Sequence, residues 1–270
     1  MTPSILKISI GGVEFHVDPT ADPYGIAFWK KLNSNRYEPD TIKFLESSVG
    51  VGTIFLDIGA ANGAMTLFAA ARGAEVVSYE PEEKVFSVLA DNVKLNPGIS
   101  QLVELKRAGI STENETIRFG RGENRKIISD IVVDGRDKLQ ETFVNILSLP
   151  DELISLSNKG KKFVVKMDIE GAEWKILNDE CSLEALRSIK ATLLVALHPG
   201  FYRKSLPNIF TTNSILRNYR RIQNLIDSLK TFKKLDRYGS VKRTNLDAVP
   251  NKYRFAFLVL AGYFEFVVEF

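Results

Sequence analysis

The stretch Phe55-Leu56-Asp57-Ile58-Gly59-Ala60-Ala61-Asn62-Gly63 decides the fold of this chain. The apolar run Thr53–Ile58 predicts a buried strand, and small residues then turn the chain into a helix predicted over Asn62–Arg72. Gly73 stands where such a helix would end. In open α/β sheets, ligands bind beside a turn of this kind, at the carboxyl end of the strand. We therefore expect the turn to line a ligand site, with Gly59, Ala60, Ala61, Asn62 and Gly63.

Short apolar runs alternate with helical stretches beyond this turn. A helix is predicted to open at Pro81 and to run to about Asn96, where Pro97 ends it, and another passes through Trp174–Leu177. Four further strands are predicted: Glu75–Tyr79, Leu102–Arg107, Phe163–Met167 and Leu193–Leu197. Strands that are apolar throughout have both faces covered, and alternating βαβ units form a parallel sheet. The fold class is therefore α/β, with a doubly wound, Rossmann-like sheet.

Three regions lie outside this alternation. A hairpin over Ile5–Val17 and helices over Tyr24–Leu32 and Asp40–Ser48 form an N-terminal extension, residues 1–50, that we expect to pack on a core domain of residues 51–270. Short strands are predicted inside the mixed region of residues 110–160, at Thr116–Phe119 and Ile127–Val133. The C-terminal part is predicted to hold a helix and then strands: Ile215–Leu229, Phe232–Arg237, Arg254–Leu260 and Phe264–Phe270.

Composition narrows the class of protein. The 270 residues are 44% hydrophobic and 26% charged, which is ordinary for a globular protein. The one cysteine, Cys181, excludes an intrachain disulfide and fits a reducing, cytoplasmic setting. With two histidines as well, histidine- or cysteine-rich metal sites are not expected. No run reaches the roughly 20 apolar residues of a membrane span, and we expect no signal peptide.

The net charge of +3 conceals a basic segment, residues 201–254. It carries thirteen Lys or Arg against three acidic residues, a local charge of +10. Such a segment can attract phosphate or nucleic acid, or it can be an ordinary solvated face.

The charges near the turn select the kind of ligand. Asp57 would repel the pyrophosphate of a dinucleotide and would attract a cationic sulfonium. The glycines are spaced G-x-x-x-G, whereas dinucleotide sites prefer G-x-G-x-x-G. Glu80 ends the next strand, 23 residues after Asp57, where a carboxylate can accept both hydrogen bonds of a ribose. These features favour S-adenosylmethionine (SAM) as the cofactor; a plain βαβ turn with a capping acid is the alternative.

At this point the chain resembles the FkbM family of SAM-dependent methyltransferases, from about residue 12 to residue 200. The resemblance rests on six blocks in the family's order. They are Tyr37-Glu38-Pro39, Phe55 to Gly63, Tyr79-Glu80-Pro81, Asn92 to Asn96 followed by Ala108, Lys166-Met167-Asp168-Ile169-Glu170-Gly171-Ala172-Glu173, and Leu197-His198. The block that begins at Lys166 is the most specific.

The resemblance implies a seven-stranded, mostly parallel sheet with one antiparallel strand. It implies methyl transfer, usually to a hydroxyl oxygen of a sugar, glycan or secondary metabolite. The residues implied to bind SAM are Glu38, Asp57, Gly59, Ala60, Ala61, Asn62, Gly63, Glu80, Pro81, Ala108 and Asp168. The basic segment 201–254 and the aromatic C-terminus depart from the family, which leaves the acceptor less defined than the cofactor.

Removal of the acceptor's proton needs a base near the methyl group. Asp168 and Glu170 follow the fourth strand, and His198 follows the fifth, so all three are candidates. Crowded with Glu173, the two acids could raise one another's pKa or hold a divalent cation, although we assign no metal ligand. Asp168 or Glu170 could instead cap the next helix or bind the amine of SAM.

Two other classes of function stay open. The basic segment suggests a nucleic-acid methyltransferase, but no (D/N)-P-P-(Y/F) block of base-amine methyltransferases is present. A SAM-binding module without catalysis is the other, and the acids at positions 57, 80 and 168 argue against it. The edge strands and aromatic C-terminus are compatible with a homodimer.

Overall fold

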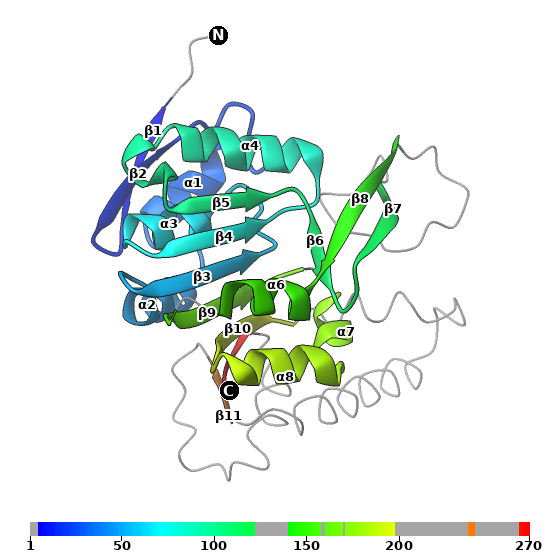
Figure 1. The fold of residues 1–270 in the computed structure, drawn as a ribbon. Coiled ribbons are helices and arrows are strands. Elements are labelled where there is room, and N and C mark those ends of the chain that lie inside the picture. Colours follow the sequence, from blue (N-terminus) through cyan, green and yellow to red (C-terminus); the bar gives the residue numbers. More distant parts are fainter. Residues whose placement is uncertain (1–4, 122–139, 158–159, 170, 198–236, 241–264) are drawn as a thin grey trace, which may run out of the picture. The chain divides into compact units, whose positions relative to one another are not determined.

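The chain has a mixed α/β fold with a mostly parallel sheet, in the computed structural model drawn in Figure 1. The structure describes residues 5–121, 140–157, 160–169, 171–197, 237–240 and 265–270. The chain divides into two compact units. One is Met1–Ile110 with Leu156–Lys166, and the other is Ser111–Ser155 with Met167–Phe270.

The first unit contains parallel strands β3 (Thr53–Ile58), β4 (Glu75–Tyr79) and β5 (Val103–Lys106). Strand β9 (Lys162–Met167) borders β3, which gives the order β9-β3-β4-β5. Asp57 is opposite Ser78, and Tyr79 is opposite Lys106. The carboxyl ends of β3, β4 and β5 therefore meet at one edge, where ligands of such sheets bind.

Helices make the crossovers between these strands. Helix α3 (Ala64–Ala71) joins β3 to β4, and α4 (Glu83–Lys94) and α5 (Pro97–Ser100) join β4 to β5 (Figure 1). Gly73 follows α3 with φ +87°, as predicted for a residue after a helix end. The prediction for Pro97 was wrong in part: α4 has already ended at Lys94, and Pro97 opens α5, because proline suits the first turn of a helix.

The predicted N-terminal hairpin and helices are confirmed. Strands β1 (Leu6–Ile10) and β2 (Val13–Val17) pair antiparallel, and α1 (Gly25–Asn33) and α2 (Pro39–Ser48) follow. Their apolar side chains share one buried core with β3 and α3, and these include Phe15, Trp29, Leu45, Phe55 and Phe68. A Cβ at Gly11, in the hairpin turn, would lie 2.7 Å from the Phe68 ring of α3. The boundary at residue 50 stays a prediction.

The second unit begins near the short strand β6 (Gly109–Ser111). Strands β7 (Glu115–Arg121) and β8 (Gln140–Ser148) pair antiparallel, and helices α6 (Leu149–Leu156), α7 (Glu173–Leu177) and α8 (Glu180–Ser188) come later in the chain. Strands β10 (Thr192–Ala196), β11 (Arg237–Ser240) and β12 (Glu265–Glu269) lie in the order β11-β12-β10. Strand β12 is antiparallel to both neighbours.

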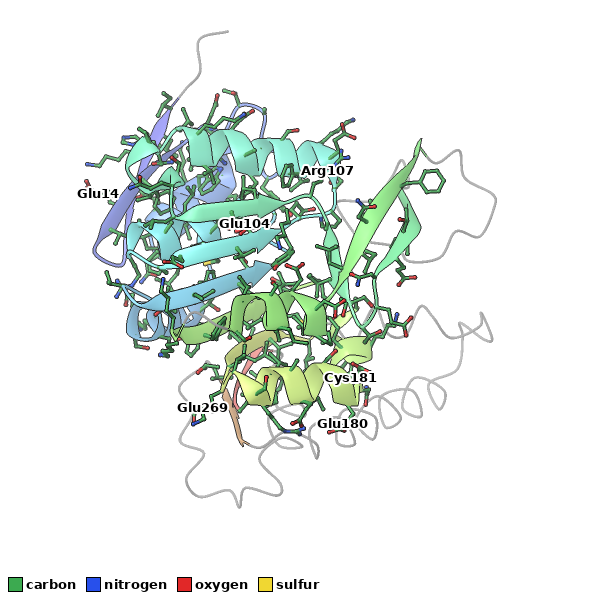
Figure 2. The ribbon with its side chains drawn as sticks, viewed as in Figure 1. Glu14, Glu104, Arg107, Glu180, Cys181 and Glu269 are labelled. Atoms are coloured by element: carbon green, nitrogen blue, oxygen red, sulfur yellow. The ribbon has the colours of Figure 1, made fainter. Side chains whose placement is uncertain are left out.

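Several elements of the second unit were not predicted, namely β6, β8, β11, α6 and α8. The predicted strand Ile127–Val133, the helix Ile215–Leu229, and all of the basic segment 201–254 except residues 237–240 lie outside the described residues. Among the described residues, no helix combines the length and the apolar run that crossing a bilayer requires. Cys181 is a free, exposed cysteine on α8, labelled in Figure 2.

Candidate functional site

The loop after β3 has a tightly constrained backbone. Gly59, Ala61 and Gly63 all have positive φ, of +83°, +50° and +89°. The N–H groups of Gly59 and Ala60 both donate to the carbonyl oxygen of Tyr79, at 3.0 Å each. These bonds tie the loop to the end of β4, so that the two strand tips form one rigid surface.

Gly63 is required for close packing as well as for its backbone angle. A Cβ at this position would lie 2.5 Å from Cδ1 of Leu89, on helix α4. Most residues with a side chain are strained at φ +89°, so a substitution here would meet both a clash and backbone strain. The absence of a Cβ at Gly63 therefore leaves room for the Leu89 side chain of α4 beside the start of α3.

Asp57 is buried and has partners within the protein. Its Oδ2 accepts a hydrogen bond from Thr66 Oγ1 at 2.7 Å, and Thr66 Oγ1 also lies 2.7 Å from Ser78 Oγ. The Nζ of Lys166 is 3.9 Å from Asp57 Oδ1, and the two side chains are only 9% and 1% exposed. A buried cation therefore already balances the charge that sequence reasoning assigned to a sulfonium, which weakens that particular argument for SAM.

Glu80 is the acid best placed to meet a ligand. It is 8% exposed, its Oε2 accepts from Ala61 N at 3.1 Å, and its Oε1 accepts from Glu82 N at 2.9 Å. Each carboxylate oxygen can accept about two hydrogen bonds, so each retains acceptor capacity. The carboxyl thus both shapes the loop and can receive two hydroxyl donors.

Burial raises the pKa of Glu80 to about 7. The backbone N–H groups of Glu82 and Ala61 lower it, and the negative charges of Glu82 and Asp57 add to the rise. Donors from a ligand would favour the charged form and so lower this pKa again.

The side chain of Asn62 points into the protein. Its Nδ2 donates to Asp22 Oδ2 at 2.9 Å, and the backbone carbonyl oxygen of Asn62 accepts from Asn92 Nδ2 at 3.0 Å. Asn96, the second asparagine of the N-x-x-x-N pattern, bonds to both backbone groups of His16 at 2.7 Å. Asn92 Oδ1 also accepts from Asp18 N at 2.9 Å, so the two asparagines fasten α4 and the start of α5 to the N-terminal segment.

Other predicted cofactor residues lie around the same strand tips. Pro81 is partly exposed just after β4, and Ala108 is buried after β5, where its N–H donates to Lys106 O at 2.9 Å. Arg107, labelled in Figure 2, pairs with Glu83 at 3.2 Å. Chain order and strand pairing thus gather these residues at one edge of the first unit.

Glu38 precedes helix α2 with φ +43°, at the N-cap position. The ring of the preceding Tyr37 packs edge-on against Phe28, with centroids 4.7 Å apart. The role of Glu38 as a cover of the SAM site stays a prediction.

The acids predicted to be catalytic follow β9 in the second unit. Asp168 is partly exposed, whereas Glu170 and His198 lie outside the described residues. Glu173 is fully buried, and its carboxylate accepts from Ile169 N at 2.9 Å and Gly171 N at 2.8 Å. Glu173 therefore holds the turn after Asp168 and does not join it as a third exposed acid.

Several residues of the site were missed by sequence reasoning. Asp22 carries no motif, and it lies 40 positions before Asn62. The role of Lys166 as the partner of Asp57 was not predicted, although a lysine inside an otherwise apolar strand is a signal of a buried ion pair. In the described part of the chain, no group of three or more His, Cys, Asp or Glu residues could hold a metal ion.

Comparisons with known proteins give a consistent set of relatives. A family model described as "Methyltransferase FkbM domain" matches residues 57–229. The hexuronic acid methyltransferase AglP of Haloferax volcanii is 26% identical over 212 residues, which are 78% of this chain and 80% of that protein.

Solved structures of low identity also match. Methyltransferase FkbM from Methylobacillus flagellatus is 14% identical, with a TM-score of 0.42, over 83% of this chain and 44% of that chain. Monomeric WbdD is 11% identical, with a TM-score of 0.39, over 88% of this chain and 40% of that chain. The chain thus spans less than half the length of these two proteins.

Proposed function

Because the family model covers more than half of its length, the chain belongs to the FkbM methyltransferase family, and we propose that it transfers a methyl group from SAM to a hydroxyl oxygen of a sugar. The observation that carries the cofactor assignment is the carboxylate of Glu80. It lies at the tip of β4, is bound to the loop through Ala61, and keeps acceptor capacity on both oxygens.

The residues at this edge fit the parts of SAM. Glu80 would accept the two ribose hydroxyls, and the loop Gly59–Gly63 would let the cofactor approach the backbone closely. Pro81 and Ala108 would border the adenine, and Glu38 would cover the site. SAM supplies an electrophilic methyl group when it is bound.

The chain must also take a proton from the acceptor hydroxyl. We propose Asp168 as the base, because it is a partly exposed acid directly after β9, with Glu170 and His198 as further members of the catalytic set. Glu173 supports this role indirectly, since its bonds to the backbone of residues 169 and 171 restrain the turn that carries Asp168. Asp168 could alternatively bind the SAM amine.

The acceptor we propose is a sugar hydroxyl on a glycan. Support comes from the similarity to AglP, whose name states that it methylates a hexuronic acid.

Calorimetric titration with SAM and with its demethylated product tests the cofactor directly. We expect binding that Glu80→Gln weakens by roughly tenfold or more, through loss of charge-assisted hydrogen bonds. Glu104→Gln is the matched control, because Glu104 is an exposed acid on the neighbouring strand β5 (Figure 2). Absence of binding by the unmodified chain would refute the proposal.

Transfer of a labelled methyl group to a panel of hexuronic acids, neutral sugars and other hydroxylated metabolites tests the acceptor. A sugar product methylated at oxygen is expected, and Asp168→Asn should lower kcat with little effect on SAM affinity. Labelling of nucleic acid and of no sugar would instead support the alternative drawn from the basic segment.

A further inference from the structure

The segment between β2 and α1 reaches the loop that follows β3. Within this segment, Asp22 is 7% exposed and accepts three hydrogen bonds. The donors are Asn62 Nδ2 at 2.9 Å, Trp29 Nε1 at 2.6 Å and Tyr24 N at 2.8 Å. One buried carboxylate thus joins the loop, helix α1 and its own segment.

Asn92 of helix α4 makes a second link between the same parts. Its Nδ2 donates to the carbonyl oxygen of Asn62 at 3.0 Å, while its Oδ1 accepts from Asp18 N at 2.9 Å. Asn62 is therefore held through its side chain by Asp22 and through its backbone by Asn92. Asp22 belongs to the segment of residues 18–22, and Asn92 is bonded to Asp18 of the same segment.

The neighbouring residue shows why the loop needs such restraint. Ala61 has φ +50°, a conformation that costs a residue with a Cβ free energy and persists only where its surroundings impose it. In this conformation, its N–H reaches Glu80 Oε2 at 3.1 Å. Fixing Asn62 fixes the adjoining peptide, and with it the orientation of the Glu80 carboxylate.

We propose that Asp22 is a positioning residue for the cofactor loop, and that residues 18–22 are a part of the binding site that acts without touching the cofactor. The inference rests on the proposed function in taking the loop Gly59–Gly63 and Glu80 as the SAM site. Asp22 precedes the family-model match at residues 57–229, so an element outside the match helps to set cofactor affinity.

The test uses the full chain and the variant Asp22→Asn, which places an amide against donors that need a carboxylate. Trp29→Phe is the matched control, because it removes another hydrogen bond to the same Asp22 oxygen and leaves Asn62 bound. Asn62→Ala breaks the link from the loop side if Asp22→Asn folds poorly. Three quantities are measured: the affinity for demethylated SAM, hydrogen exchange of the amides of residues 59–63, and the denaturation midpoint.

We expect Asp22→Asn to weaken the affinity about tenfold and to speed exchange in the loop of the unliganded chain. Trp29→Phe should lower the denaturation midpoint while affinity stays within about twofold and loop exchange is unchanged. The inference is overturned if both variants change affinity and exchange in proportion to their loss of stability, or if Asp22→Asn changes neither. If the unmodified chain binds no cofactor, the proposed function fails, and exchange in the unliganded chain still decides the positioning role.

Discussion

Replacing Glu80 by glutamine should change how the stability of the unliganded protein depends on pH. Burial raises the pKa of this carboxyl to about 7 in the folded protein, from its ordinary value of 4.5, which holds in the unfolded chain. At a pH between these two pKa values, the folded state binds more protons than the unfolded state. The free energy of unfolding therefore falls as pH rises through this window.

The magnitude follows from the difference between the two pKa values. At 1.36 kcal/mol for each pKa unit, the destabilisation that accumulates by neutral pH is about 3 kcal/mol. Glu80 is 8% exposed, so solvent screens little of this effect. Glutamine cannot ionise, and it loses one acceptor for the backbone N–H groups of Ala61 and Glu82, at a pH-independent cost of about 1 kcal/mol.

Urea unfolding of the unmodified protein and of Glu80→Gln, from pH 4.5 to pH 8, measures this pH dependence of stability. Stability of the variant relative to the unmodified protein should rise with pH by about 3 kcal/mol across the window, with most of the change complete by about pH 7. Glu104→Gln, at an exposed position, should follow the unmodified protein in its pH dependence.

Cofactor affinity gives an independent reading of the same group. Ribose hydroxyls donate to the charged carboxylate, so cofactor binding below about pH 7 must expel a proton from Glu80. As the pH decreases below 7, the affinity should therefore fall by up to about tenfold for each pH unit. Glu80→Gln should lack this slope, and comparing the two proteins cancels the titration of the ligand itself. Parallel stability curves and equal affinity slopes for the two proteins would refute the reasoning.

Three further substitutions test the surrounding packing by chemical unfolding and hydrogen exchange. Gly63→Ala should lower the free energy of unfolding by about 2 kcal/mol or more, because it adds a 2.5 Å clash with a leucine of α4 to backbone strain. Gly52→Ala, with φ +83° and open space around its Cβ position, should show the strain alone, and equal losses of stability in the two variants would contradict the clash. Lys166→Met should destabilise the fold by about 3 kcal/mol, because it removes the cation 3.9 Å from Asp57. Adding Asp57→Asn should recover part of that loss, and additive losses of stability would argue against a coupled pair. Glu173→Gln should cost about 1 to 3 kcal/mol and speed exchange of the amides at positions 169 and 171, and unchanged exchange there would show that the carboxylate does not hold the turn.

The sequence by itself determined the strands β3, β4 and β5 of the first unit and the place of the loop. The apolar run Thr53–Ile58 forms β3 at the predicted residues, and the glycines at positions 59, 63 and 73 adopt the positive φ that such turns require. These features depend on local chemistry, namely side-chain apolarity and the absence of a Cβ, so they can be read from neighbouring residues. The same local blocks sufficed to identify the family.

Only the tertiary structure decided what the polar groups of the site contact. Asp57 faces Thr66 and Lys166 within the protein, and Asn62 donates to Asp22, 40 positions earlier in the chain. The proton affinity of Glu80 depends on burial by the surrounding elements. The physical reason is that hydrogen-bond partners and desolvation are set by which segments pack together, and spacing along the chain does not record that packing.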